Sequence, residues 1–476
     1  MITLTRYKLI CSRCGKIQDN LFLNRCKNCG GAIRIEYNYD TIKLNRVSGK
    51  GILRYKELLP IEMVSNNLSM GEGETPLIRS LRLSKELGVN NLFLKNETVN
   101  PTGSFVDRGV FIAVSKILEK KFKKIITGPS PNLAISLAAY VTRFGIELIS
   151  YVPKNLSIGK LYQLVAYGAK IRFGEISFEG LRENSYYYVD QSNPYYLEGL
   201  KTIIFEIFEQ LNNRLPDFLF IPMGTGGNLS MIWKGIEEIK KIGLVDEIST
   251  KLVGVQSEDC SHIVDKFFEM KTRVKRKTKP LLDDLCLEDE DLAEWAINAI
   301  RSSKGYALKV GVKKILEATL ELSRKEGIFP EPSAAAAMAG VEIAREMGII
   351  DKDDLIVTII TGSGLKDPTY IRDVIERSKG LRKLIEHSTR VKKSSLGKTK
   401  QLILELLSMS EKNIYEIWKS LGKDFGLYMS YTSVFQHVKE LEKMGLISKT
   451  YYIEGRKKAV YFLTKKGENM LKILKV

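Results

Sequence analysis

The sequence predicts an α/β protein whose main body holds parallel β-sheets covered by helices, with a small unit at each end. Three observations lead to this prediction. From about Gly71 onward, short runs of β-branched and aromatic residues alternate with stretches of helical spacing, a pattern typical of parallel sheets. Four cysteines cluster near the N-terminus, and the last hundred residues carry an excess of positive charge. We therefore expect four segments, at residues 1–37, 38–375, 376–396 and 397–476.

The bulk properties exclude several classes of protein. A chain of 476 residues is long enough for more than one domain. It contains no run of about 18 apolar residues, so we expect no membrane span. Its first residues lack the apolar region of a secretory signal, so we expect a cytoplasmic protein. The three histidines, His262, His387 and His437, lie outside every motif described below, which argues against a histidine-based catalytic triad.

The N-terminal segment has the spacing of a zinc ribbon. Two Cys-x-x-Cys pairs are separated by eleven residues, and a glycine follows each pair. Two such turns can place four thiolates tetrahedrally around one Zn²⁺, which leaves no open coordination position and therefore indicates a structural ion. Disulfides are the alternative, which reducing conditions in the cytoplasm disfavour. The expected ligands are Cys11, Cys14, Cys26 and Cys29, whereas Cys260 and Cys286 are expected to be ordinary buried thiols.

Two motifs of the body lie where a strand meets a helix. Asn100–Gly109 reads Asn-Pro-Thr-Gly-Ser-Phe-Val-Asp-Arg-Gly, follows the strand-like run Leu92–Leu94 and precedes a stretch of helical spacing. Pro222–Leu229 is a glycine-rich turn after a second strand-like run, Phe218–Ile221. Such a turn directs backbone N–H groups and a helix N-terminus at a bound phosphate, and glycine allows the close approach. Alone, this second motif is weak evidence.

These motifs, together with Gly71–Leu77 and Thr361–Asp367, resemble those of threonine synthases and related fold-type-II pyridoxal-phosphate (PLP) enzymes. The resemblance implies two α/β lobes with the cofactor between them, and some of these enzymes carry a similar N-terminal ribbon. It also implies a ring-nitrogen contact for Thr361 and a ring-oxygen contact for Asn132. The phosphate cup implied by the resemblance consists of Gly224, Thr225, Gly226, Gly227 and Asn228.

The chain departs from that family where the chemistry occurs. Its ten-residue motif matches nine positions, and the mismatch places Val106 where the family has the lysine that holds PLP as a Schiff base. Valine has no nitrogen and can neither bind the aldehyde nor transfer protons. Lys95 and Lys366 do not substitute for it, because the family commonly has lysines there as well. The segment Pro129–Asn132 replaces the family's carboxylate-binding loop, and each of its prolines removes an N–H donor.

We therefore expect a pocket that holds PLP or another phosphorylated small molecule non-covalently and does not convert it. The alternative is a decaying enzyme that binds nothing. The intact run Gly226–Asn228 argues against uniform decay.

The C-terminal hundred residues are basic. Residues 377–476 contain 22 Lys and Arg against 9 Asp and Glu, which accounts for +13 of the net charge of +18. Such an excess indicates a polyanionic partner, nucleic acid being the commonest, although a solvated basic tail is the alternative. Apolar spacing predicts helices over 400–409, 414–421 and 430–444, two strands over 446–453 and 459–463, and a helix over 465–474.

Three helices followed by a hairpin with a basic tip resemble the winged helix-turn-helix family. The resemblance implies that the third helix enters the major groove of double-stranded DNA and that the hairpin contacts phosphates or the minor groove. A winged helix used for protein contacts is the alternative, which the positive charge disfavours. The candidate DNA contacts are Ser430, Tyr431, Thr432, Ser433, Gln436, Lys439, Arg456, Lys457 and Lys458.

Together these features indicate a transcriptional regulator that senses a small-molecule effector with a catalytically inactive, threonine-synthase-like pocket and binds DNA. We expect a homodimer, because both resembled families usually form one. The alternative from another class is an active PLP-dependent threonine synthase or lyase with an accessory winged-helix domain. That enzyme would need an amine from elsewhere in place of the missing lysine.

Overall fold

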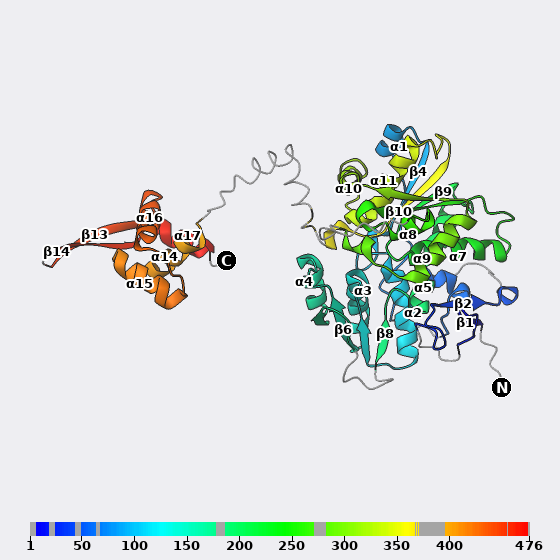
Figure 1. Cartoon of the computed structure of the whole chain (residues 1–476), viewed down its shortest axis with the longest axis horizontal. Helices are drawn as coiled ribbons and strands as arrows, with labels where there is room; N and C mark the ends of the chain where they lie inside the picture. The colour runs from blue at the N-terminus through cyan, green and yellow to red at the C-terminus, as the bar shows by residue number, and fades with distance from the viewer. Residues whose placement is uncertain are drawn as a thin grey trace. The chain divides into compact units, whose positions relative to one another are not determined.

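The computed structural model describes residues 6–18, 24–42, 49–62, 67–177, 186–270, 282–366, 368, 370, 396–454 and 456–474. The chain divides into two compact units, Met1–Val374 and Ile375–Val476 (Figure 1). No helix among the described residues is long and apolar enough to cross a bilayer.

The larger unit contains a six-stranded sheet with the strand order β11-β10-β9-β12-β4-β3. Four of its five neighbouring pairs are parallel, and only the edge strand β3 runs antiparallel to its neighbour β4. Every residue of β9 and β12 is buried, as expected for inner strands covered on both faces. The strands are β3 (Leu77–Arg79), β4 (Asn91–Asn96), β9 (Phe218–Pro222), β10 (Lys251–Ser257), β11 (Tyr306–Val310) and β12 (Leu355–Ile360).

Alternate residues of β9 point into two different cores. Phe218 and Phe220 belong to the core with α1 (Arg82–Leu87), α10 (Val312–Glu326) and α11 (Pro332–Glu346). Leu219 and Ile221 belong to the core on the other face of the sheet. That face is covered by α7 (Gly227–Lys241), α8 (His262–Phe267) and α9 (Glu290–Ser302), and α5 (Pro194–Leu200) and α6 (Thr202–Gln210) pack against α7. Because successive side chains of a strand point to opposite faces of the sheet, β9 contributes side chains to both helical layers.

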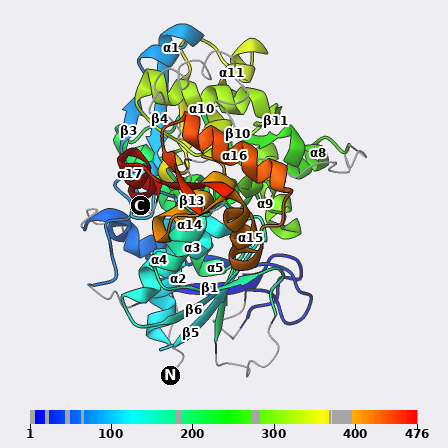
Figure 2. The ribbon, with the colours of Figure 1, turned by 90° about the vertical axis from the view of Figure 1, so that its left-hand side faces the viewer.

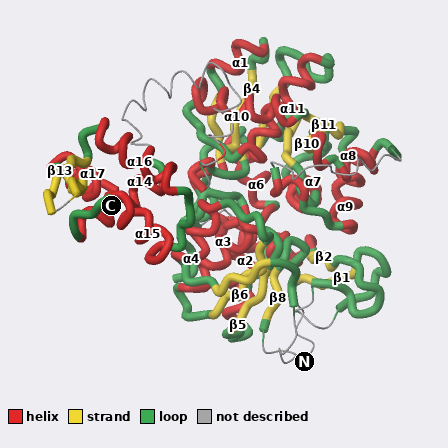
Figure 3. The backbone as a smooth tube through the Cα atoms, turned by 60° about the vertical axis from the view of Figure 1, so that its left-hand side comes forward, coloured by secondary structure: helices red, strands yellow, loops and turns green. Residues whose placement is uncertain are grey.

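A second sheet has the order β7-β6-β5-β8, and its pairs are all parallel. Its strands are β5 (Lys124–Thr127), β6 (Glu147–Val152), β7 (Lys170–Phe173) and β8 (Tyr187–Val189). Its helices are α2 (Val106–Glu119), α3 (Pro131–Thr142) and α4 (Ile158–Ala166). Figures 2 and 3 show its strands apart from those of the larger sheet, so the unit has two lobes. The expected parallel sheets are confirmed.

The N-terminal residues pack against this body. Strands β1 (Tyr7–Cys11) and β2 (Ile33–Tyr37) form an antiparallel pair with alternating burial. Arg13 and Arg25 both form ion pairs with Asp291 of α9, and Arg25 also reaches Asp289. Short 3₁₀ helices follow at η1 (Tyr39–Thr41) and η2 (Gly51–Leu58).

The smaller unit has its own apolar core. Helix α15 ends four residues later than expected and β14 begins three residues earlier, and the predicted helices and hairpin are otherwise confirmed to within about two residues. Val434, Val438 and Leu441 face the core as predicted. The elements are α14 (Lys398–Met409), α15 (Ile414–Phe425), α16 (Tyr431–Lys443), the antiparallel strands β13 (Ile447–Glu454) and β14 (Arg456–Leu463), and α17 (Lys465–Leu474).

Candidate functional site

A cavity of about 80 Å³ lies where several element ends of the larger unit meet. These are the start of α2, the start of α3, the turn between β9 and α7, the 3₁₀ helix η5 (Asp283–Cys286), the start of α11 and the residue after β12. The carboxyl ends of parallel strands are the usual place for a ligand in an open α/β sheet. Its polar and charged lining residues are Ser104, Ser130, Asn132, Gln191, Thr225, Asn228, Asp284, Glu331, Ser333 and Thr361.

Val106 lines this cavity and is only 2% exposed. It is the first residue of α2, so its isopropyl group stands where the helix begins. Among the described residues, the cavity lining contains no lysine, arginine or histidine. The cavity therefore offers an aldehyde no side-chain amine.

The other residues of the Asn100–Gly109 motif are held by buried contacts. Arg108, with 0% exposure, donates to both carboxylate oxygens of Glu97 at 2.7 and 2.8 Å and to both of Glu206 at 2.6 and 2.7 Å. Asp107 accepts from the N–H and hydroxyl of Thr102. A Cβ on Gly109 would lie 2.4 Å from the Tyr196 ring. Four of the nine matching residues, Thr102, Asp107, Arg108 and Gly109, are thus explained by packing and charge pairing, without catalysis.

The glycine-rich turn forms the N-terminus of α7. Gly226 has φ +92°, a left-handed conformation that glycine adopts readily. A Cβ there would lie 2.7 Å from Ala296, and one on Gly224 would lie 2.5 Å from the Asp284 carbonyl. Packing alone therefore requires these glycines, and their presence does not distinguish a binding pocket from one that binds nothing.

Asn228 gives independent support for a ligand at this turn. The nitrogen and the oxygen of its side-chain amide are both inaccessible to solvent and have no hydrogen-bond partner. An unsatisfied buried amide costs roughly 1–3 kcal/mol, so a partner from a ligand is expected. The first N–H groups of α7 also lack intrahelical acceptors, as at every helix start.

Asn132 is turned toward two carboxylates. Its amide nitrogen donates to Glu331 at 3.1 Å and to Asp284 at 3.4 Å. Because carboxylates only accept, this network fixes which amide atom is the nitrogen. Its oxygen is buried and has no partner. Pro131 lies at the first position of α3, so the proline removes an N–H from a helix start beside the cavity.

Lys160 of α4 joins the same two carboxylates. Its Nζ lies 2.6 Å from Asp284 Oδ2 and 3.1 Å from Glu331 Oε1. Burial favours the neutral amine, but the two carboxylates outweigh it and raise the pKa of Lys160. The lysine is therefore held as a cation, which is not nucleophilic.

A family model described as "Pyridoxal-phosphate dependent enzyme" matches residues 68–362 of the chain, which include every residue that lines the cavity. The chain belongs to this family. Threonine synthase from Methanocaldococcus jannaschii is 39% identical over 377 residues, covering 75% of this chain and 92% of that protein. Threonine synthase from Methanosarcina acetivorans is 33% identical over 386 residues, covering 78% of this chain and 95% of that protein.

Solved structures of the same fold agree. A fungal L-serine ammonia-lyase from Rhizomucor miehei superposes with a TM-score of 0.55 at 20% identity, covering 64% of this chain and 98% of that one. Threonine deaminase isoform 2 from Solanum lycopersicum gives 0.52 at 24% identity, covering 64% and 88%. At these identities the structures show the fold alone, and the two-lobed fold-type-II body expected from the sequence is confirmed.

The family's cofactor fits the cavity only in part. The turn at Gly226 and Asn228 offers unsatisfied donors to a phosphate, and Thr361 lines the cavity after β12. Covalent attachment does not fit, because Val106 has no amine. The lysines considered from sequence are committed elsewhere: Lys95 Nζ donates to Glu206 at 2.7 Å, and Lys366 Nζ donates to the Thr102 carbonyl at 2.7 Å.

The four N-terminal cysteines come together as the spacing predicts. Their sulfur atoms all lie within 4.8 Å of one another. Cys11 ends β1, Cys14 lies in the turn that follows it, and Cys26 and Cys29 precede β2. Burial opposes ionisation of Cys26, but the N–H groups of Asn28 and Cys29 outweigh it and lower the pKa of that thiol to about 6. Four thiols at this separation can hold one metal ion.

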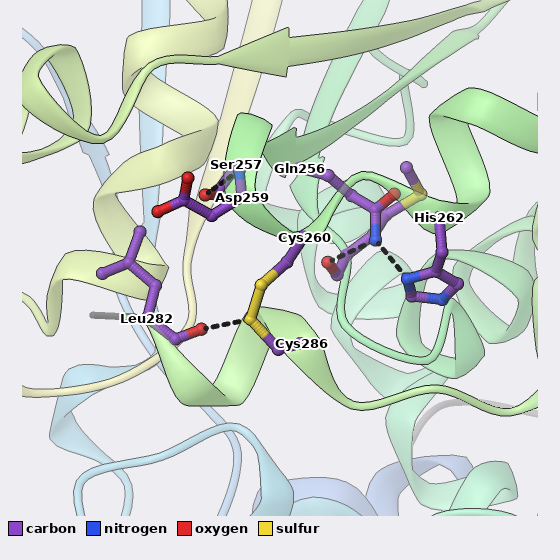
Figure 4. The surroundings of a disulfide bond; sticks show 8 residues. Gln256, Ser257, Asp259, Cys260, His262, Leu282 and Cys286 are labelled. Atoms are coloured by element: carbon purple, nitrogen blue, oxygen red, sulfur yellow. Dashed lines mark hydrogen bonds between the residues drawn. A yellow bond between two sulfur atoms is a disulfide. The ribbon is translucent and has the colours of Figure 1, made fainter. Parts of the chain in front are cut away.

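The expectation for the two remaining cysteines is wrong. Cys260, at the end of η4 (Glu258–Cys260), and Cys286, at the end of η5, form a disulfide (Figure 4). The bond joins the segment that follows β10 to the segment that carries Asp284 into the cavity. The two cysteines are 26 residues apart and have no paired spacing, so only the fold brings them together.

In the smaller unit, the candidate residues of α16 divide into two groups. Tyr431, Thr432, Gln436 and Lys439 are exposed. Ser430 is the N-cap, and its hydroxyl lies 2.8 Å from that of Ser433, so these two side chains are engaged in capping. The side chains of Arg456, Lys457 and Lys458 lie outside the described residues.

Sequence reasoning missed Phe435 on the same helix. Its side chain is 40% exposed, and Lys439 Nζ lies 5.8 Å from the centre of its ring. Tyr431, Phe435 and Lys439 follow one another at intervals of four residues and therefore share a face. That spacing, in a row beside that of Val434 and Val438, is the signal that could have identified it.

Proposed function

We propose that this member of the PLP-dependent enzyme family is a catalytically inactive, threonine-synthase-like protein that binds a phosphorylated small molecule without a covalent bond and acts as a ligand-responsive DNA-binding regulator. The observation that carries the proposal is Val106 in a cavity whose described lining has no lysine. PLP, when bound in the family's covalent mode, withdraws electrons from the substrate's Cα. Without an amine at residue 106, we derive no step through it.

What this chain's residues do is hold and shield a ligand. The N-terminus of α7 and the Asn228 amide would bind the phosphate, and Thr361 would face the ring nitrogen if PLP is the ligand. Pro131 removes an N–H that could bind a carboxylate. Binding without conversion is the behaviour required of a sensor.

Absorbance spectroscopy tests the covalent step. Purified protein mixed with PLP should lack the band near about 410–430 nm that a lysine-linked PLP gives. Borohydride reduction followed by peptide mass spectrometry should find no PLP–lysine adduct within residues 68–362. A trapped adduct on a cavity lysine, or sustained turnover of an amino-acid substrate, would instead favour the active threonine synthase or lyase that the names of the relatives suggest.

We propose that the smaller unit is a winged helix that binds double-stranded DNA. In its support, three helices precede an antiparallel hairpin. The residues of α16 that point away from the core are exposed and include Lys439. The hairpin strand β14 begins with Arg456, Lys457 and Lys458. Phosphate contacts from these four cations would bind DNA independently of its sequence.

Fluorescence anisotropy with a labelled 30-base-pair duplex tests DNA binding. The full chain should bind at low salt, and a chain ending at residue 393 should not. Replacing Arg456, Lys457 and Lys458 with alanine should weaken binding to unrelated duplexes equally, because phosphates carry no sequence information. A charge-matched control replaces Lys313, Lys352 and Lys123 of the larger unit, and equal binding by the truncated chain would overturn the assignment.

We further propose that the N-terminal cysteines form a zinc ribbon with one structural Zn²⁺. Four thiols within 4.8 Å support this, and ion pairs from Arg13 and Arg25 to Asp291 would transmit the order of the ribbon to α9. Metal analysis should give one zinc per chain, and Cys29→Ser should lower that content. A chain purified without zinc that retains the same melting temperature would contradict a structural role.

A further inference from the structure

Negative charge and hydrogen-bond acceptors gather around Asp284, Glu331 and Asn132 in the cavity lining. Two carboxylates line it, Asp284 and Glu331, and a single lysine, Lys160, contacts both. Glu331 is 5% exposed, so water screens it little. Lys366 also interacts electrostatically with both carboxylates and with Asp107. With these two lysines and three carboxylates ionised, one negative charge is left for a ligand to balance.

One free hydrogen-bonding atom beside these carboxylates can only accept. Asn132 Oδ1 has no partner, and its residue is 8% exposed, while the amide nitrogen is already committed to the carboxylates. Ser104 lines the cavity at 1% exposure, and its hydroxyl, which can donate or accept, also has no partner. An aldehyde has no donor to offer Asn132 Oδ1, whereas an ammonium group has three.

A carboxylate on the ligand is disfavoured in the same place. Asp284 and Glu331 would repel it, and the residue at the start of α3 is Pro131, which has no N–H to donate. Two parts of the lining therefore select opposite charges: the N-terminus of α7 with its unpartnered Asn228 amide selects an anion, and the two carboxylates select a cation.

We propose that the ligand is a phosphorylated primary amine without a carboxylate, and that the pocket selects the amine form of the vitamin B6 phosphates over the aldehyde form. This inference rests on the proposed function, since it identifies the chemical class of the ligand for the same cavity. The phosphate lies at α7, and the ammonium group lies among Asp284, Glu331 and Asn132 Oδ1.

Two kinds of ligand share this chemistry, a small aliphatic phosphoamine and pyridoxamine 5′-phosphate, and they differ in size. The volume is about 80 Å³, against about 150 Å³ for a cavity that holds benzene. This volume is closer to that of a small aliphatic phosphoamine than to that of pyridoxamine 5′-phosphate, which adds an aromatic ring. The experiment therefore includes both.

Calorimetric titration of the zinc-loaded full chain tests the inference with two matched pairs of probes. O-Phosphoethanolamine and O-phosphoserine differ only by a carboxylate, and pyridoxamine 5′-phosphate and pyridoxal 5′-phosphate differ only in amine against aldehyde. O-Phosphoethanolamine should bind about tenfold or more tightly than O-phosphoserine, and pyridoxamine 5′-phosphate about tenfold or more tightly than pyridoxal 5′-phosphate, as expected for a charge-assisted hydrogen bond. Inorganic phosphate should bind more weakly than either preferred probe.

Variants separate the two ends of the pocket. Glu331→Gln should weaken binding of the preferred amine about tenfold and leave inorganic phosphate unchanged, and Asn228→Ala should weaken both. Glu342→Gln is the control, because Glu342 lies on α11 about 16 Å beyond Glu331, the N-cap of that helix. Asp284→Asn repeats the test should Glu331→Gln not fold, which a thermal melt reveals.

The outcomes are distinct. Tight non-covalent binding of the aldehyde form, equal binding of O-phosphoserine, or binding of no probe would overturn this inference and leave the DNA-binding regulator standing. A covalent adduct with a cavity lysine would overturn the proposed function itself. The order of affinity between O-phosphoethanolamine and pyridoxamine 5′-phosphate identifies an aliphatic or a cofactor-derived ligand.

Discussion

Replacing Arg108 with methionine should destabilise the larger unit severely although it changes no catalytic group. Methionine has a similar length but leaves Glu97 and Glu206 facing each other without the cation between them. Removing one partner of a fully buried ion pair costs about 3–5 kcal/mol, because the remaining charge stays buried and unpaired. Lys95, 2.7 Å from Glu206, compensates for only one of the two carboxylates.

The pKa of Glu206 depends on the same interaction. Burial alone would raise this pKa, but Arg108 and Lys95 outweigh it and lower the pKa from 4.5 to about 2. A shift of this size corresponds to about 3 kcal/mol. Because the folded pKa is depressed, this stability is present above pH 4.5 and is lost as the pH falls toward 2.

Urea unfolding between pH 3 and 7, followed by tryptophan fluorescence, measures both effects. Trp418 lies in the smaller unit, so a Trp418→Phe background confines the signal to Trp233 and Trp295. The difference between Arg108→Met and its parent should shrink toward low pH. Burial raises the pKa of Glu72 and of Asp107, but their contributions are common to both proteins and cancel.

Arg214→Met is the matched control, because Arg214 is 64% exposed and its pair with Asp217 should contribute at most about 1 kcal/mol. If Arg108→Met unfolds within 1 kcal/mol of its parent at pH 7, the buried network does not hold the motif. The persistence of nine of its ten residues would then need another explanation.

Three further predictions follow from other parts of the chain. Val106→Lys should give the absorbance band near about 410–430 nm with PLP, because it restores the amine. It should still not turn over an amino acid, because Pro129 and Pro131 remove N–H donors for the substrate carboxylate. Turnover by this variant would refute the role given to the prolines. After zinc removal and denaturation, the protein should expose four reactive thiols, and six once the Cys260–Cys286 disulfide is reduced. Reduction of this disulfide should lower the free energy of unfolding by up to about 3.5 kcal/mol for a loop of this length. Four phosphate contacts predict a slope of about −3.6 for the logarithm of DNA affinity against that of salt, or about 150-fold between 50 and 200 mM, and a slope near zero would exclude phosphate binding.

The sequence was sufficient for the parts of the fold that depend on local patterns. The parallel strands at Leu355–Ile360 and Phe218–Pro222, the helices of the smaller unit and the gathering of four cysteines all follow from period, composition and spacing, which act over a few residues. The absence of an amine at residue 106 is likewise a fact of the sequence.

Tertiary structure decided what surrounds those residues. Lys160, Asp284 and Glu331 come from three segments that lie far apart in the chain, and no local pattern brings them into contact. The disulfide between Cys260 and Cys286 and the packing need for Gly226 are likewise contacts between distant segments. A residue's type is local, but its burial, its charge partners and its free hydrogen-bonding atoms depend on every element packed against it.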